Sequence, residues 1–188
     1  DAQVHAALSS WLASHASHAL DLRAPLHQLS LHAQRVLCHE TAQTHRAALL
    51  AGQADPAVET LGWLGLAMPE AWYQASITAR GPWLTRFVRE VFASADVLVL
   101  PSLPRPVPDW DQVHVGEARF DARELLALHH FMGFVNYLGL PALSVPIARD
   151  AAGRPISAQL VARPFAEPLL LDLASQCPSF PFSFSKVP

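Results

Sequence analysis

Histidines gather near the beginning of this chain, where they could in principle bind a metal ion. Seven of the ten lie within the first 45 of 188 residues. His39 and Glu40 are followed by His45, six positions after the first histidine, whereas a zinc-binding helix places its two histidines four apart. Because zinc sites need three or four converging ligands, we interpret the histidines as solvated helix side chains and predict no metal. A histidine-rich metal-binding protein is the least favoured hypothesis.

Ser144 is the serine that most invites interpretation as a nucleophile. It lies inside the apolar run 142–146, which is typical of a strand, without the Gly-x-Ser-x-Gly elbow that exposes a hydroxyl. The chain has a single lysine, Lys186, and none of its eight glycines are adjacent. Chemistry that needs an internal lysine, or a glycine-rich loop around a nucleophile or a phosphate, is therefore absent from this chain. We predict no catalytic residue and no cofactor.

The composition excludes several classes of protein. With 51% hydrophobic and 15% charged residues, the chain can bury a core and is not disordered. A net charge of −3 excludes binding to nucleic acid through a basic surface, and no apolar run reaches about 18 residues, so no membrane span is expected. The first residues do not resemble a signal peptide, and Cys38 and Cys177 match no disulfide or zinc spacing. We therefore expect a reducing, cytoplasmic setting.

The elements that must position these residues follow from hydrophobic spacing and from proline and glycine. The first half predicts mainly helices, with one short strand over 18–22. Gly81-Pro82 should kink or break the last of these helices, because an interior proline removes a backbone donor. The expected helices cover residues 3–16, 29–50, a segment from Pro56, and 69–95.

The second half predicts strands. Residues 96–100 form a uniformly apolar run, which fits a strand buried on both faces, and a proline-rich loop follows. The turn residues 149–155 separate two further strands, 142–146 and 156–161, and so predict an antiparallel hairpin. Helices are expected over 122–135 and 167–175. The predicted fold is α/β, a mixed sheet of a few strands flanked by several helices, and the sheet needs neighbours that this chain does not obviously supply.

Several blocks of this sequence resemble the amidase signature family in order and spacing. The resemblance extends over roughly residues 33–175, and its motifs are structural, so they are specific for the family and uninformative about substrate. The matching blocks are Glu40 through Leu50, Gly65-Leu-Ala-Met-Pro-Glu-Ala-Trp-Tyr73, Phe92 through Pro104, Asn136-Tyr-Leu-Gly-Leu-Pro-Ala-Leu-Ser-Val-Pro146, Asp150-Ala-Ala-Gly-Arg-Pro155 and Ala158-Gln-Leu-Val-Ala-Arg-Pro-Phe165.

The resemblance implies a serine, cis-serine and lysine triad, with the nucleophile in a glycine- and serine-rich signature and the lysine upstream. Both belong to the half of the family that precedes the matched region, and Lys186 follows the last matched block. We therefore interpret residues 1–176 as the C-terminal portion of an amidase domain whose catalytic N-terminal half is missing, and 177–188 as an irregular tail. Whether this chain is itself an enzyme stays open, and we predict that it is inactive alone.

By the same resemblance, two segments should approach a substrate: a loop around Gly62–Met68 and the turn Asn136–Pro141. The candidate substrate-binding residues are Trp63, Met68, Asn136 and Gly139, although core packing and turn geometry explain them equally well. We expect Gln159 to be a buried amide bonded to the backbone, and Arg163 to cap a strand end and pair with an acid.

Two functions from different classes follow. In the first, the complete protein hydrolyses a small-molecule amide through a serine acyl-enzyme, and this chain supplies scaffold and part of the acyl pocket. The family branch that transamidates tRNA should carry an arginine near residues 56–66; residues 57–64 contain none, which favours a general amidase. In the second, the chain is a non-catalytic pseudoenzyme or partner subunit that binds through an exposed sheet edge.

Overall fold

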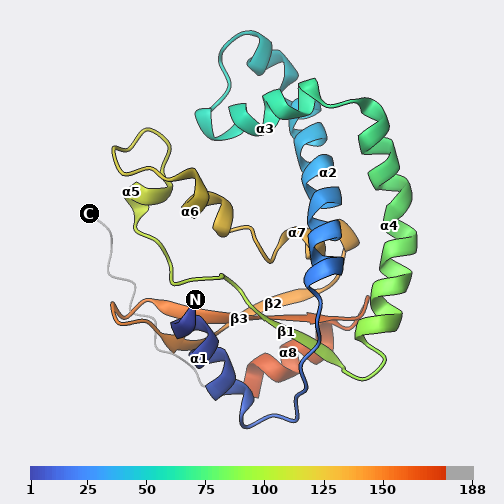
Figure 1. The fold of residues 1–188 in the computed structure, drawn as a ribbon, viewed down its shortest axis with the longest axis vertical. Coiled ribbons are helices and arrows are strands. Elements are labelled where there is room, and N and C mark those ends of the chain that lie inside the picture. The colour runs from blue at the N-terminus through green and yellow to red at the C-terminus, as the bar shows by residue number, and fades with distance from the viewer. Residues whose placement is uncertain (177–188) are drawn as a thin grey trace.

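The computed structural model describes residues 1–176, which fold as helices around a small sheet (Figure 1), so the predicted α/β class is confirmed. The predicted irregular tail, 177–188, lies outside the described residues. In chain order the elements are α1 (Ala2–Leu12), α2 (Arg23–Leu50), α3 (Pro56–Ala67), α4 (Glu70–Val91), β1 (Val97–Pro101), α5 (Trp110–Val113), α6 (Ala122–Ala127), α7 (Gly133–Leu138), β2 (Ala142–Arg149), β3 (Pro155–Ala162) and α8 (Glu167–Gln176).

The three strands are ordered β1-β3-β2, and both pairs are antiparallel. The predicted hairpin between β2 and β3 is confirmed, and Ser144 lies opposite Gln159 in it. β1 lies at an edge of the sheet, where only Leu98 is buried and the other strand residues are half-buried. The prediction that both faces of this strand are buried is therefore wrong for most of its length, because it has one neighbouring strand in the described chain.

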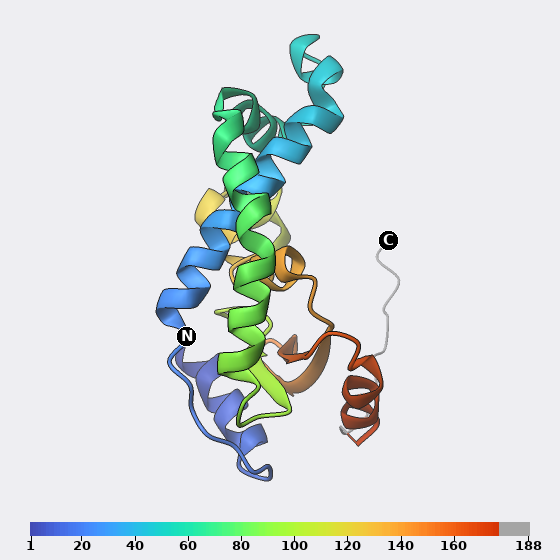
Figure 2. The same ribbon diagram turned by 90° about the vertical axis from the view of Figure 1, so that its right-hand side faces the viewer.

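Helices cover both faces of the sheet. Leu160 and Val145 belong to an apolar cluster with Leu8 of α1 and Leu170 of α8. On the opposite face, Val161 and Leu98 pack in a second cluster with side chains of α2, α4 and α7. Helices α2 and α4 run side by side along the long axis of the molecule (Figure 2). Each sheet face thus has its own helical layer and its own apolar core.

Three predicted elements differ from the structure. Residues 18–22 form no strand. Helix α4 continues through Pro82 without a break; Thr78, whose carbonyl loses its helical partner there, is exposed and can bond to water instead. The predicted helix 122–135 is two short helices, since α6 contacts α5 whereas α7 packs against α2. Within residues 1–176, no helix combines the length and the apolar character needed to cross a bilayer.

Candidate functional site

One face of the sheet changes from apolar to polar along its length. Ser157, Gln159 and Val161 alternate along β3 and therefore project from the same face. Val161 is fully buried in the apolar core beneath the helices. Towards the other end, Ser144 lies opposite Gln159, and the Ser102 N–H donates to the Ser157 carbonyl at 2.9 Å. The strands thus bring three serines and one glutamine together.

The side chains of this polar end bond to one another and to the backbone. The Ser102 and Ser144 hydroxyl oxygens are 2.7 Å apart; Ser102 is buried and Ser144 is exposed. The buried Gln159 amide donates to the Phe131 carbonyl at 3.0 Å, so the predicted backbone bond of this residue is confirmed. A second hydroxyl is no stronger a base than the first. The serine pair therefore lacks the activation that a nucleophile needs.

A cleft of about 250 Å³ opens beside the serine pair. Apolar side chains, including Val4, Met132 and Ile156, line part of it, and the three serines line the rest. Arg105, on the loop after β1, also lines the cleft, and its guanidinium is 2.5 Å from the Glu124 carboxylate. The positive charge at the cleft is therefore already paired with a negative one.

Helix α3 carries two of the predicted substrate-binding residues. It begins where Asp55 caps Pro56, with the Asp55 carboxylate accepting from the Ala57 N–H at 2.8 Å. Trp63 is 48% exposed, and Met68 is half-buried at the end of the helix. The prediction of a loop around Gly62–Met68 is wrong, because this segment is helical up to Ala67 and packs against α2.

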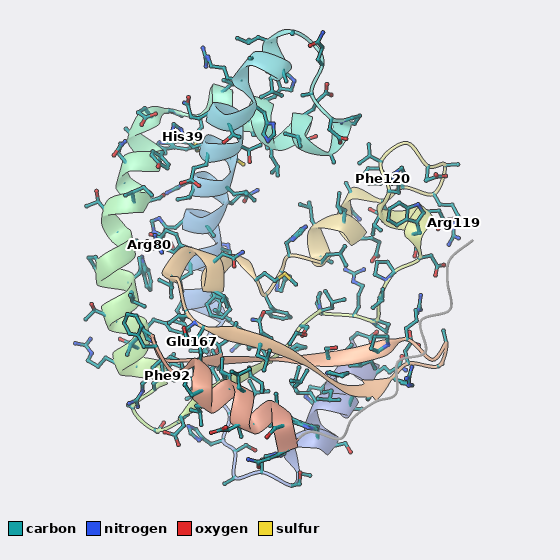
Figure 3. The ribbon with its side chains drawn as sticks, turned by 180° about the vertical axis from the view of Figure 1, so that it is seen from behind. His39, Arg80, Phe92, Arg119, Phe120 and Glu167 are labelled. Carbon is teal, nitrogen blue, oxygen red and sulfur yellow. The ribbon has the colours of Figure 1, made fainter. Side chains whose placement is uncertain are left out.

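Helix α7 and its end carry the other two predicted residues. Asn136 is exposed within the helix, and Gly139 ends the helix in the left-handed conformation with φ 69°. A Cβ at Gly139 would lie 2.9 Å from a guanidinium nitrogen of Arg80, which reaches over from α4 (Figure 3). Glycine therefore meets two requirements of this turn, a positive φ and space beside Arg80.

The four predicted residues form two separate pairs. Figure 1 places α3 and α7 at different heights along α2, and Figure 2 shows the same separation from the side. None of Trp63, Met68, Asn136 and Gly139 lines the cleft at the polar end of the sheet. Their role in binding a substrate stays a prediction.

Two histidines of α2 are less exposed than predicted. His39 is buried, stacks on the Tyr73 ring with centroids 3.9 Å apart, and approaches the Glu70 carboxylate at 3.5 Å (Figure 3). His32 lies 3.1 Å from the Ser76 hydroxyl; burial, and then the nearby Arg35, lower its pKa. The interpretation of all the histidines as solvated is therefore wrong for these two, which hold α2 against α4. Residues 1–176 contain no cluster of three side chains suited to a metal ion.

The ends of the hairpin strands are held by polar contacts. The Asp150 carboxylate accepts from the Ala152 and Arg154 N–H groups and from the Arg154 guanidinium at 2.8 Å. Burial opposes ionisation of this carboxyl, but these bonds prevail and its pKa is lowered. At the other end, Arg163 donates to the Phe92 carbonyl. The predicted acidic partner of Arg163 is wrong for the described residues.

Sequence reasoning missed most residues that line the cleft, namely Val4, Ser102, Arg105, Met132, Ile156 and Ser157. The alternation of Ser157 and Gln159 along an otherwise apolar strand was a usable signal, since polar residues on a covered face call for an explanation. Ser102 carried no such signal. It joins the site only because β1 pairs with β3, which the sequence spacing does not indicate.

Comparison with known proteins gives consistent similarities. A family model described as Amidase matches residues 2–171. Fatty acid amide hydrolase from Medicago truncatula is 33% identical over 92 residues, which cover 49% of this chain and 15% of the relative. A glutamyl-tRNA(Gln) amidotransferase from Prosthecochloris aestuarii is 31% identical over 105 residues, covering 56% of this chain and 21% of the matched relative. This chain therefore spans only a small fraction of these relatives.

Solved structures share the arrangement of elements. One described as the crystal structure of amidase aligns with a TM-score of 0.73 at 24% identity, over 92% of this chain and 41% of that chain. The structure of 6-aminohexanoate cyclic dimer hydrolase complexed with substrate aligns with a TM-score of 0.65 at 22% identity, over 93% of this chain and 39% of that one. At these identities the likeness shows a common fold.

Proposed function

The chain belongs to the amidase family, since the family model matches residues 2–171, and we propose that it is the C-terminal, non-catalytic portion of an amidase. The observation that carries this proposal is a contradiction within the chain. It matches the family over most of its length, yet its single lysine is Lys186, beyond the matched region, and it has no glycine-rich signature. The reacting groups would then lie in a catalytic half outside these 188 residues.

In the complete protein, the proposed reaction is hydrolysis of a carbon–nitrogen amide bond. A serine hydroxyl of the catalytic half attacks the amide carbonyl, and the carbon–nitrogen bond breaks as the amine leaves with a proton. Water then attacks the resulting ester and releases the acid and the serine. The present chain supplies strands, helices and one wall of the acyl pocket. It requires no cofactor for this role.

We propose a small-molecule amide as substrate in preference to a tRNA-linked one. Relatives named for fatty acid amides and for tRNA amidotransfer both match this chain. Residues 57–64 contain no arginine to hold a glutamine carboxylate. The apolar Trp63 and Met68 suit an uncharged acyl group, and Asn136 and Gly139 would approach it from α7. Cys38, a free and buried thiol whose pKa burial raises, supports the cytoplasmic setting that we propose.

The second candidate is a pseudoenzyme or partner subunit. β1 and β2 are the outer strands of the sheet, so the described chain leaves one edge of each without a neighbouring strand. Such edges pair readily with a strand from another polypeptide. In this case the chain would bind its partner through the sheet edge and would contribute nothing to hydrolysis.

Hydrolysis of p-nitroacetanilide, followed by release of p-nitroaniline, tests both candidates. The chain alone should give the rate of buffer. Co-expression with the N-terminal half of a related amidase, including its glycine- and serine-rich signature, should give a complex that releases p-nitroaniline. The same complex with the nucleophilic serine of that half replaced by alanine is the control. Turnover by the chain alone would overturn the proposal, whereas a stable complex without turnover would favour the pseudoenzyme.

A further inference from the structure

We propose that the cleft beside the Ser102–Ser144 pair is a binding site for a small, uncharged amide. The proposal names a neutral ligand and the residues that would hold it. Only the choice of an amide rests on the proposed function, because the cleft, its hydroxyls and its paired charge belong to the described chain itself.

The serine pair leaves one hydroxyl proton without an acceptor in the pair. Each hydroxyl carries a single donor hydrogen, and the contact of 2.7 Å between the two oxygens uses one of the two. Ser102 is buried and Ser144 is exposed. When Ser102 donates, Ser144 accepts from it and can direct its own hydrogen into the cleft. A carbonyl oxygen is the ligand atom that such a donor binds.

The same cleft can accept a hydrogen bond. Ser157 is half-buried on the neighbouring strand and lines the cleft together with the serine pair. Its hydroxyl oxygen has lone pairs that an amide N–H can use. An amide presents an acceptor and a donor side by side, so it complements neighbouring hydroxyls better than a ketone or an ester, which lacks the N–H group.

Charge and size restrict the ligand further. Arg105 would attract a carboxylate, but the Glu124 carboxylate is already 2.5 Å from its guanidinium. A second carboxylate would meet repulsion from Glu124. Val4, Met132 and Ile156 offer an apolar surface for an alkyl group. A volume of about 250 Å³ lies below that of most drug-sized pockets and favours a ligand of a few carbon atoms.

Isobutyramide and isobutyrate are probes of the same shape that differ in charge. Each is titrated at pH 7 into the full chain labelled with ¹⁵N, and binding is followed by backbone amide shifts. Isobutyramide should shift the amides of Ser102, Ser144 and Ser157, and isobutyrate should not at equal concentration. The proposal is overturned if isobutyramide moves none of these signals at its highest usable concentration, or if isobutyrate binds equally well.

A double variant tests the hydroxyls. Ser102→Ala with Ser144→Ala removes both members of the pair, which costs little stability because neither partner is left alone. Isobutyramide should bind about 3- to 10-fold more weakly to it, as expected for one lost hydrogen bond. Ser175→Ala, an exposed serine on α8 across the sheet, is the matched control and should bind as the parent does. Unchanged affinity in the double variant would overturn the role of the pair.

Glu124→Gln tests the charge. This change releases Arg105 from its ion pair, so isobutyrate should gain at least about 3-fold in affinity while isobutyramide is unaffected. No gain for isobutyrate would refute the argument that Glu124 sets the preference for a neutral ligand. These experiments measure binding by this chain alone. Their failure therefore removes the cleft proposal and leaves the proposed hydrolysis, which is measured by turnover, to its own test.

Discussion

The sheet and the α2–α3 contact solve the same packing problem in opposite ways. In the sheet, large apolar side chains such as Leu160 and Val161 fill the space beneath the helices and are fully buried. Where α3 meets α2, the buried residues of α3 are Gly62 and Gly65, while Trp63 and Leu64 are 48% and 52% exposed. A Cβ at Gly65 would lie 1.9 Å from the Cys38 carbonyl oxygen. Side chains hold one region, and their absence permits the other.

The difference shows what an apolar side chain means in each region. Along β3, an apolar residue indicates the core. On α3, the large apolar residues face away from α2, since only glycine lets the two backbones approach so closely. Trp63 and Leu64 therefore keep an apolar surface free for another group, which fits the acyl pocket wall that we propose.

The largest expected effect is on the sheet. Leu160→Ala removes a fully buried side chain from the central strand and leaves a cavity between β3 and the helices α1 and α8. We expect a loss of about 3 to 4 kcal/mol in the free energy of unfolding. Urea denaturation of the parent and the variant measures it. A loss below about 1 kcal/mol would mean that side-chain packing does not hold this region.

Gly65→Ala should have the next largest effect, because the new methyl group meets a backbone carbonyl that cannot rotate away. We expect a loss of about 2 to 3 kcal/mol. Gly81→Ala is the matched control: it lies in α4 with nothing within 4 Å of the new carbon, and should stabilise by about 0.5 to 1 kcal/mol. If both substitutions stabilise the protein, the close contact of α2 and α3 is wrong.

Asp150 gives the sheet a pH dependence. Its pKa is lower in the folded chain than the ordinary value of 3.8, so the ionised form stabilises the fold above that value. This stabilisation is lost as the pH falls below 3.8 and through the folded pKa. Unfolding measured between about pH 2 and pH 6 should show a smaller decline on acidification in Asp150→Asn than in the parent. Equal declines would remove Asp150 as a source of the stability of the turn.

The smallest effect on stability is expected at Trp63. Trp63→Ala removes an exposed side chain from the side of α3 that faces away from α2, so unfolding should change by less than about 0.5 kcal/mol. In a complex that hydrolyses an amide, the same variant should raise KM. A large loss of stability would show that the tryptophan packs in the fold, and an unchanged KM would remove it from the proposed substrate wall.

Much of the fold could be predicted from local patterns. The apolar run 96–100 and the turn residues 149–155 were sufficient for β1 and the hairpin, because strands and turns depend on neighbouring residues. The uninterrupted course of α4 through Pro82 was not predictable in this way, since it depends on whether the freed carbonyl is exposed. The same holds for the division of 122–135 into α6 and α7, which follows from different packing partners.

The candidate site was harder to predict than the fold. Gln159 was identified because an amide on a buried strand needs a partner. Ser102, Arg105 and Met132 come together from the end of β1, the loop after it and the turn before α7, so no sequence spacing connects them. The predicted substrate residues depended on family resemblance, and their two pairs lie on separate helices. The site therefore requires strand pairing that only the structure supplies.

The central claim is that this chain contains no activated serine nucleophile. A fluorophosphonate forms a covalent bond to the oxygen of an activated serine and releases fluoride, and intact-protein mass spectrometry detects the added mass. The account predicts that the mass of the 188-residue chain stays unchanged, and that in a complex that hydrolyses an amide the label appears on the catalytic half. A stoichiometric label on Ser144, or on any other serine of this chain, would contradict it.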